Sequence, residues 1–336
     1  RRHSTSGVNG LKIAQARESG NPYPGDLSFQ AVKQSSGSYK LYVIAHVYIE
    51  DYLYGVVPYE MGNSSNVEAL KAQAVAARTY TVRMMSRRAS GRYDVVDTTS
   101  DQVYRGTPSG NANCVTAIDS TRGIVLQYGG EYVMTYYSAS NGGQTESAPH
   151  GVGSGAYAYF TVKDDPFDYA NPSSTVKKKT VYKDLTHASN PSGLISLLQR
   201  KAESQLGQSV TLVSLQSVTP HTPKYEAPSR LYTKMDFELT ARTASGSLQT
   251  VTVTCDIFSE LESMLGMSIQ SAKNELWSVE ETASGFSLQA RRYGHGVGMS
   301  QRGAMYMGKL GYTYDEILGF YYEGCQRVQK SFTSTI

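Results

Sequence analysis

Glu60 is a single carboxylate in the apolar stretch YGVVPYEMG, residues 54–62, just before a segment that we expect to form a long helix. A glutamate among apolar neighbours loses hydrating water, and desolvation raises the pKa of a carboxyl group. A raised pKa keeps the group protonated near neutral pH, as a general acid requires. The stretch therefore predicts an acid catalyst, or else a glutamate that caps or pairs with the following helix.

Lys71 and Arg78 are seven residues apart in that segment, which is nearly two helical turns, so they share one face. Arg78 follows the run of small residues at 72–77, which can pack tightly. A charge in such a place needs a partner, and Glu60 and Gln102 are candidates. Two other interpretations stay open, in which Lys71 is solvated and Arg78 makes a structural salt bridge.

Two polar loops could line a cleft. The first, YYSASNGGQTES at residues 136–147, carries hydroxyl groups and glycine amides, although the pattern also suits an ordinary hairpin connection. The second, GHGVGMSQRGA at residues 294–304, places His295 between two glycines, which favours an exposed or cleft-lining histidine. It resembles GxGxxG only loosely and no βαβ unit surrounds it, so it does not indicate a nucleotide site.

A serine nucleophile can be considered in these loops. Ser138 or Ser140 could act with His295 or His150. In α/β-hydrolases the nucleophile sits on a sharp turn with the pattern G-x-S-x-G. Neither serine lies in such a turn, so we do not expect a serine hydrolase.

The composition of the 336-residue chain is that of a globular protein, with 40% hydrophobic and 18% charged residues. The net charge of +3 and the lack of a dense basic cluster argue against a nucleic-acid partner. Tyrosine is abundant, with 26 residues against 8 phenylalanines. A tyrosine ring can stack on a sugar while its hydroxyl group binds sugar hydroxyls, although tyrosine also replaces phenylalanine at half-buried strand positions.

The cysteines are few and far apart. Cys114, Cys255 and Cys325 form no CxxC motif, so neither a zinc ribbon nor a thioredoxin-type site is expected, and at most one internal disulfide can form. No stretch reaches the roughly 18 to 20 apolar residues of a membrane span. Because the sequence begins RRHSTSGVNG without a methionine, we expect that an N-terminal segment has been removed.

The strongest predicted helix covers residues 65–88, with a capping box from Ser65 to Glu68. Its alanine-rich middle favours helix and permits close packing. Two further helices are predicted near the C-terminus. Ser300 and Thr313 are their expected N-cap residues, and Thr313 repeats the capping-box spacing.

The rest of the chain reads mostly as strands. Residues 27–59 alternate in the manner of strands and lead into a loop that holds the candidate acid, and residues 93–165 read as short strands with turns. Residues 170–180 resemble a linker. Residues 181–270 predict a helix, three strands and a short helix, and strands return after residue 275.

Three of these stretches are specific when taken together. They are GVVPYEM followed by EALKAQAVAARTY, the loop that ends in GGQTES, and GHGVGMSQRGAMYMGKLGYTYDEILGFYY. In combination they resemble the sporulation stage II protein D / amidase-enhancer (LytB) family. The resemblance runs from about residue 40 to residue 327 and so covers most of the chain.

The resemblance implies an activity and a set of site residues. Active members of the family are peptidoglycan lytic transglycosylases, which cleave the β-1,4 bond between N-acetylmuramic acid and N-acetylglucosamine. In the sporulation branch an amidase first removes the stem peptides. The catalytic glutamate of the family falls on Glu60 and its arginine on Arg78. The other matched polar positions are expected to bind or support the glycan: Lys71, Gln102, Tyr104, Tyr137, Ser138, Ser140, His295 and Gln301.

The implied reaction accounts for a lone carboxylate. Ordinary glycosidases use two, whereas here the 6-hydroxyl group of muramic acid attacks its own anomeric carbon and gives a 1,6-anhydro product. Glu60 would protonate the leaving oxygen and then accept the hydroxyl proton. Two alternatives stay open: a non-catalytic glycan-binding module that stimulates a cell-wall amidase, and a two-carboxylate glycosidase that pairs Glu60 with Asp97 or Asp101.

Metal binding is one point at which this chain departs from some of the relatives that it resembles. Those relatives bind a metal through histidine or cysteine near the Ser-Gly-Gly loop. Here Tyr137 precedes Ser138 and the loop holds no cysteine. We therefore predict no zinc there and no other cofactor.

Together these patterns predict an α+β protein. A core of residues 30–171 and 276–336 would be completed by an inserted α/β subdomain at 172–275, with a glycan groove between them and Glu60 at its floor. The expected partners are peptidoglycan glycan strands and, through the resemblance, a cell-wall amidase and other engulfment proteins. The expected location is extracytoplasmic, with a membrane anchor in the missing N-terminal segment.

Overall fold

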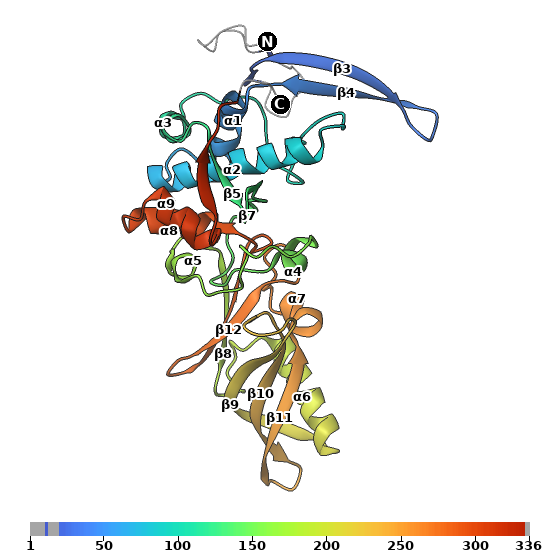
Figure 1. Ribbon diagram of the computed structural model, residues 1–336. Coiled ribbons are helices and arrows are strands. Elements are labelled where there is room, and N and C mark those ends of the chain that lie inside the picture. The colour runs from blue at the N-terminus through green and yellow to red at the C-terminus, as the bar shows by residue number, and fades with distance from the viewer. Residues whose placement is uncertain (1–10, 13–19, 333–336) are drawn as a thin grey trace. The chain divides into compact units, whose positions relative to one another are not determined.

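The computed structural model describes residues 11–12 and 20–332 (Figure 1). The chain divides into two compact units, and each is discontinuous in sequence. Helices and strands occur in both units, which confirms the predicted α+β class. The ranges of the first unit are Arg1–Tyr137, Ala158–Phe160 and Ala304–Ile336, and those of the second are Ser138–Tyr157 and Thr161–Gly303.

The predicted insertion at residues 172–275 lies entirely within the second unit. The three-part division of the chain itself stays a prediction. Among the helices of the described residues, none has both the length and the apolar character that crossing a bilayer requires.

The first unit is built around a helix of small residues. This helix, α2, is in contact with α1, α3, α9 and β5. The alanines at its centre are fully buried, as close packing requires. A small antiparallel sheet has the strand order β15-β5-β6, and β3 pairs with β4 in a separate hairpin. The elements are β1 (Leu11–Lys12), β2 (Pro22–Tyr23), β3 (Asp26–Lys33), β4 (Tyr39–His46), α1 (Ile49–Met61), α2 (Val67–Arg87), α3 (Ala112–Ser120), β5 (Ile124–Tyr128), β6 (Glu131–Tyr132), α9 (Tyr314–Tyr321) and β15 (Gln326–Gln329).

The second unit holds two three-stranded antiparallel sheets, with orders β11-β10-β9 and β12-β13-β8. Side chains from both sheets and from α6 share one apolar core, which includes Trp277 and Phe237. The elements are α4 (Ala148–Val152), α5 (Pro166–Ala170), β8 (Val176–Tyr182), α6 (Ser192–Leu206), β9 (Val210–Pro223), β10 (Tyr232–Thr243), β11 (Leu248–Asp256), η1 (Ile257–Leu261), α7 (Glu262–Met264), β12 (Leu276–Glu281), β13 (Gly285–Arg291) and β14 (Met299–Ser300). Two elements span the boundary of the units: β7 (Tyr137–Ser138) and α8 (Gln301–Lys309).

The stretch before residue 60 differs from the prediction, because α1 occupies Ile49–Met61 where strand and loop were expected. Its buried residues include Tyr52, Leu53, Val56 and Val57, a helical spacing that faces α2. Pro58 lies inside the helix. Because proline usually breaks helices, it hid this period from the sequence analysis.

The prediction of Ser65 as the N-cap residue of α2 is also wrong. Asn66, rather than Ser65, is the N-cap, and its side chain accepts a hydrogen bond of 2.8 Å from the backbone N–H of Glu68. The Ser65 hydroxyl instead donates to the carbonyl of Met61 over 2.7 Å. The Thr313 capping box is confirmed, and so is Ser300, which accepts from the N–H of Gly303.

Two loop assignments need correction. Residues 93–104 contain no strand; the Asp101 carboxylate instead holds this segment by accepting from the N–H of Val96 over 2.8 Å and from Arg88 over 2.7 Å. The expected linker at 170–180 begins at the last residue of α5 and ends inside β8, which pairs along its length with β13. The lysines at 177–179 therefore belong to a strand that backbone hydrogen bonds hold in a sheet.

Candidate functional site

Glu60 lies in the last turn of α1 and is half-buried. The negative end of a helix dipole disfavours a carboxylate at this position. Its charge also acts on two tyrosines, the buried Tyr52 and the half-buried Tyr137. Burial is the largest cause that raises the pKa of Tyr52 and of Tyr137, and the charge of Glu60 raises both further. Both phenols therefore stay neutral and can donate hydrogen bonds beside the candidate acid.

Gln102 joins these two tyrosines. Its Oε1 accepts from the Tyr52 hydroxyl over 3.2 Å and from Thr81 over 2.9 Å, and its Nε2 donates to the Tyr137 oxygen over 3.0 Å and to the carbonyl of Ala77 over 3.2 Å. Gln102 is almost fully buried. Its amide thus has partners on both sides and fixes the position of both rings. The structure brings the predicted residues Gln102 and Tyr137 together, and Tyr137 lies within electrostatic reach of Glu60.

Tyr52 is a member of this group that the sequence analysis missed. It lies about two turns before Glu60 on the same helix, a relationship visible only once residues 49–61 are recognised as helical. The predicted residue Tyr104 packs its ring against Tyr52 with 4.9 Å between the ring centroids. Gly55 allows this approach, because a Cβ atom there would come within 2.4 Å of the Tyr104 ring.

Arg78 has a different partner from the two that were expected. It is fully buried, and its guanidinium group donates to the Glu50 carboxylate over 2.8 Å and 3.0 Å and to the carbonyl of Ile124 over 3.1 Å. Burial lowers the pKa of Arg78, and the charge of Glu50 opposes that shift. The structural salt bridge is therefore the interpretation that the geometry favours, and neither Glu60 nor Gln102 is the partner.

Lys71 is half-buried at the contact between α2 and α9. Its Nζ donates to Glu68 over 2.6 Å and lies 5.8 Å from the centroid of the Tyr314 ring. Glu68 also accepts from the N–H of Tyr314 over 2.8 Å. Through these contacts Lys71 helps to join α2 to α9. Its expected role in binding glycan stays a prediction.

The remaining predicted residues, Ser138, Ser140, His295 and Gln301, belong to the second unit. Ser140 and Tyr293 exchange two backbone hydrogen bonds of 2.9 Å each, so the two polar loops pair with each other. The Ser138 hydroxyl accepts from the N–H of Gly296 over 3.3 Å, and Nδ1 of His295 accepts from the N–H of Val297 over 3.0 Å. Both side chains thus hold the glycine-rich turn in shape.

A buried carboxylate that the sequence analysis missed organises the serine-rich loop. Asp168 is fully buried, and it accepts from the hydroxyls of Ser140 over 2.8 Å and Ser174 over 2.7 Å. It also accepts from the N–H groups of Gly142 over 2.6 Å and Gly143 over 3.3 Å. The Ser140 hydroxyl donates its proton to Asp168 in this hydrogen bond, so the geometry does not favour Ser140 as a nucleophile.

Gly142 shows why this loop needs glycine. Its φ is +75°, and a Cβ atom there would come within 2.9 Å of the backbone nitrogen of Arg292. Arg292 is itself buried and donates to the carbonyls of Asn141 over 3.0 Å and Gln144 over 3.1 Å. Burial lowers the pKa of Arg292, and Glu146, 3.4 Å away, opposes the shift. The loop is therefore held from both sides by buried charge.

Metal and thiol chemistry find no support in the described part of the chain. Within residues 11–12 and 20–332, no group of three or more His, Cys, Asp or Glu side chains could hold a metal ion. Burial raises the pKa of the Cys114 thiol to about 11 and that of Cys255 to about 12. Both thiols stay protonated and unreactive at neutral pH.

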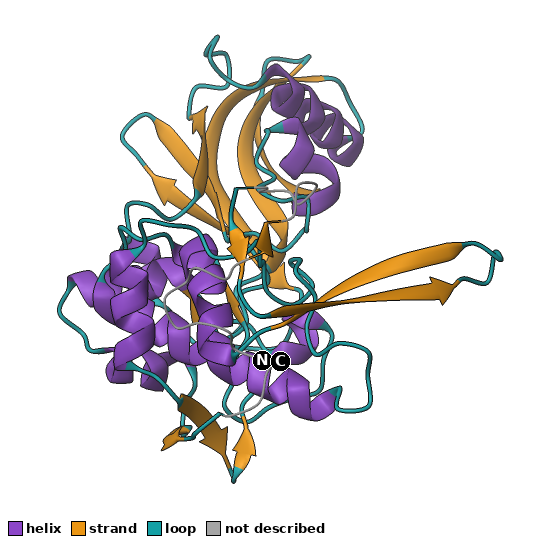
Figure 2. Ribbon diagram, turned by 90° about the horizontal axis from the view of Figure 1, so that it is seen from above, coloured by secondary structure: helices purple, strands orange, loops and turns teal. Residues whose placement is uncertain are grey.

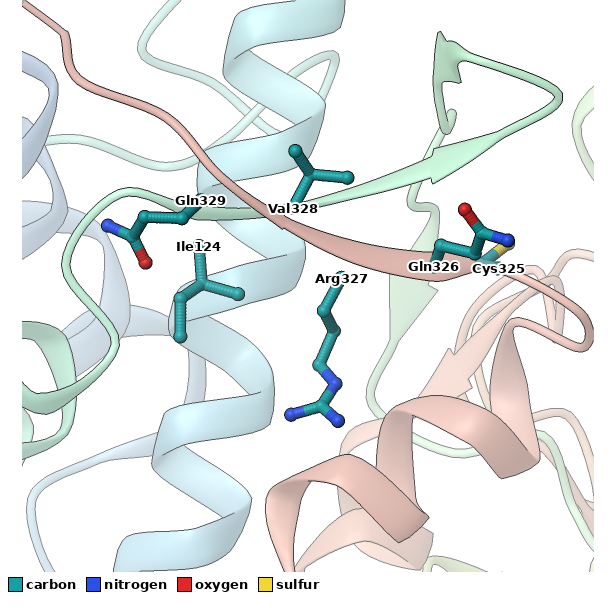
Figure 3. A pocket seen from close by; sticks show the side chains of 6 residues that line it. All are labelled: Ile124, Cys325, Gln326, Arg327, Val328 and Gln329. Carbon is teal, nitrogen blue, oxygen red and sulfur yellow. The ribbon is translucent and has the colours of Figure 1, made fainter.

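One surface pocket lies along the edge strand β15 of the first unit, with a volume of about 460 Å³ (Figure 3). It contains none of the predicted site residues, so it lends no support to their roles. Its lining residues are Ile124, Cys325, Gln326, Arg327, Val328 and Gln329.

Comparisons with known proteins agree with the motifs. The profile of the family described as Stage II sporulation protein matches residues 37–128, which include Glu60, Arg78, Gln102 and Tyr104. A protein of Brachyspira hyodysenteriae described as uncharacterized is 30% identical over 86% of this chain and 70% of its own length.

Two similar proteins of Bacillus subtilis carry descriptive names. The amidase enhancer is 33% identical over 81% of this chain, and the aligned region spans only 39% of that relative. Stage II sporulation protein D is 27% identical over 94% of this chain and 86% of its own length. With its motifs, its profile match and these relatives, the chain belongs to the SpoIID/LytB family of stage II sporulation protein D and amidase enhancer.

Proposed function

We propose that this chain is a peptidoglycan lytic transglycosylase in which Glu60 is the single acid and base. The observation that carries the proposal is the setting of Glu60, a half-buried carboxylate at a helix end whose charge acts on the buried phenols of Tyr52 and Tyr137. A single carboxyl group in such a setting suits a reaction in which one group acts first as the acid and then as the base.

The reaction uses one carboxyl group twice. Glu60 gives its proton to the glycosidic oxygen, the bond from that oxygen to the anomeric carbon of N-acetylmuramic acid breaks, and N-acetylglucosamine leaves with a free 4-hydroxyl group. The 6-hydroxyl oxygen of the muramic acid then bonds to the same anomeric carbon. Its proton passes to the Glu60 carboxylate, which restores the acid and gives the 1,6-anhydro product.

The state of Asp101 supports one carboxylate over two. Its oxygens accept from Arg88 over 2.7 Å, from the Tyr80 hydroxyl over 2.8 Å and from the N–H of Val96 over 2.8 Å. These partners give the Asp101 carboxylate a structural role in holding its loop. Asp97, the other candidate for a two-carboxylate glycosidase, is exposed, whereas Glu60 is half-buried.

A role in the cell wall follows for this chain from the proposed activity and from the names of its relatives. We place it outside the cytoplasm, acting on glycan strands whose stem peptides have been removed, in spore engulfment or wall remodelling. A cell-wall amidase that removes those peptides is the expected partner. The relative named amidase enhancer favours a second candidate, a non-catalytic glycan-binding module that stimulates the amidase.

The test is mass spectrometry of products from peptide-stripped glycan strands. We expect 1,6-anhydro-muramic ends from the wild type and none from Glu60→Gln, with glycan binding retained. Glu131→Gln, an exposed glutamate paired with Arg83, is the matched control and should cleave like the wild type. Reducing ends with added water would indicate a two-carboxylate hydrolase. Binding without cleavage by the wild type would indicate the enhancer.

A further inference from the structure

The hairpin of β3 and β4 exposes a row of large apolar side chains. In the cross-strand register Phe29 lies opposite Val43, and Lys33 lies opposite Tyr39. Residues opposite each other share one face of the ribbon, and alternate residues along a strand do too. This face, called the apolar face below, therefore carries side chains with these exposed fractions: Phe29 64%, Tyr39 68%, Leu41 64% and Val43 48%.

The protein covers the other face of the same ribbon. Tyr42 stacks on Tyr93 with 6.3 Å between ring centroids, and Arg92 lies 5.0 Å from the centroid of Tyr42. Arg92 also donates to Gln30 over 2.9 Å. Figures 1 and 2 show the ribbon extending away from the helices of the first unit. One face is thus supported from within the unit, and the apolar face is left to solvent.

An exposed face of this kind calls for an occupant. A two-stranded ribbon is only marginally stable in water, and contiguous apolar patches on soluble proteins mark sites of interaction. The occupant has to match the charge as well as the apolar surface. The apolar face carries Lys33 and no acidic residue, whereas Lys40 and Asp26, the one acidic residue of β3 and β4, lie on the opposite face. The occupant is therefore apolar beneath and negatively charged at its surface.

A second copy of the chain fits these features poorly. Each strand has 8 residues, so one face of the ribbon offers an area on the order of 300 Å² from the strand rise and spacing. A stable protein interface buries about 800 Å² on each partner. A bilayer surface needs only a few inserted side chains and attracts lysine.

We propose that the apolar face docks on an anionic lipid bilayer, with its aromatic and aliphatic side chains among the headgroups and Lys33 at the lipid phosphates. Lys40 projects from the opposite face beside the same turn and adds attraction that acts within a Debye length of the surface. The ribbon would lie flat on the surface, since its turn at residues 34–38 is polar. Lysine can bury its carbon stem and keep its charge at the headgroups. This surface is separate from the proposed glycan chemistry and holds whether or not the chain cleaves glycan.

Sedimentation of the whole chain with lipid vesicles tests the proposal. One vesicle set contains phosphatidylglycerol and the other contains only phosphatidylcholine. We expect binding to the phosphatidylglycerol set that weakens at least about tenfold when salt is raised from 0.05 to 0.5 M, because the lysine contribution is screened. Two double variants, Phe29→Ser with Leu41→Ser and Lys33→Glu with Lys40→Glu, should each bind at least tenfold more weakly. The control is Leu310→Ser, which removes an equally exposed leucine elsewhere in the first unit.

Several results would overturn the proposal. Equal binding to both vesicle sets would show that negative lipid charge is not needed. No binding to either set would show that a bilayer is not the occupant of the apolar face. Equal binding by the wild type and both double variants would place the lipid contact elsewhere. A dimer in sedimentation velocity that Phe29→Ser with Leu41→Ser dissociates would make a second copy the occupant. Circular dichroism of each variant checks that the helices are intact.

Discussion

Arg78 and Glu50 form a buried ion pair inside the first unit, with 2.8 Å between Nη2 of the arginine and Oε2 of the glutamate. The pair joins α2 to α1, the helix that carries Glu60, and the backbone N–H of Gly123 adds a further bond of 2.9 Å to Glu50. The arginine of the AVAARTY motif therefore positions the helix of the candidate acid rather than the acid itself.

Removing this arginine should destabilise the first unit. Arg78→Ala leaves the Glu50 charge buried without its partner, and breaking such a pair costs about 3–5 kcal/mol. Hydrogen exchange of the α2 amides, followed by mass spectrometry, should show faster exchange over residues 67–87. Arg83→Ala is the control, because its partner Glu131 is exposed and such pairs contribute about 0–1 kcal/mol. Lost cleavage with unchanged exchange would instead assign Arg78 to the substrate.

Tyr52→Phe tests whether the buried phenol network positions Glu60. The change removes the hydroxyl that donates to Gln102 and keeps the ring against Tyr104. We expect a stability loss of about 1 kcal/mol, the usual contribution of one hydrogen bond, and about a tenfold fall in kcat with little change in KM. Tyr54→Phe on the same helix is the control, because its hydroxyl bonds to the exposed Asp119. A rise in KM alone would argue that Tyr52 binds glycan and does not position the acid.

The sequence predicted this site in part, for reasons that particular residues make clear. Glu60, Gln102 and Tyr137 are polar residues in recognisable motifs, and the structure joins Gln102 to Tyr137, whose pKa the charge of Glu60 raises. Tyr52 was missed because Pro58 obscured the helix that relates it to Glu60. Asp168 was missed because its partners are backbone amides and hydroxyls of a loop distant in sequence, and no local pattern marks such contacts.

The fold was predictable where one face of an element is buried and its ends carry caps. Helix α9 has a buried face and a capping box at its start. Strands β9, β10 and β11 alternate buried and exposed side chains over much of their length. Prediction failed at residues 93–104, whose course is fixed by the side chain of Asp101 rather than by strand pairing. A carboxylate that organises a loop leaves no period in the sequence.

The second unit should lose stability as pH rises from about 4.5 to about 7. Burial, first, and then the neighbouring Glu275 raise the pKa of Glu262 from 4.5 to about 7. Within that window the folded chain keeps a proton that the unfolded chain releases, so rising pH favours unfolding, and the effect is complete above about 7. Trp277, the only tryptophan, is buried in this unit, so its fluorescence reports the unfolding.

Two variants separate this carboxyl pair from other titrating groups. Glu262→Gln keeps a hydrogen-bond donor toward Glu275 but no longer titrates. The free energy of unfolding should therefore fall less between pH 4.5 and 7 in this variant than in the wild type. Glu260→Gln should act in the opposite direction. The pKa of Glu260 is lowered despite burial by the N–H of Asp256 and by Lys201, so this variant removes stability that is present above pH 4.5. An unchanged slope in Glu262→Gln would place the titrating group elsewhere.

Asp168→Ala should disrupt the serine-rich loop. The variant leaves the hydroxyl of Ser140 without its acceptor, whereas Ser174 keeps the backbone carbonyl of Asp168 and the N–H of Gly142 keeps Ser140 Oγ. A buried unsatisfied group costs about 1–3 kcal/mol, so we expect a loss in that range, measured by denaturant unfolding with Trp277 fluorescence. Asp168→Asn keeps an acceptor and should lose less. The exposed Asp184→Ala is the control, with a change below about 1 kcal/mol. Equal stability of Asp168→Ala and the wild type would show that this carboxylate does not hold the loop.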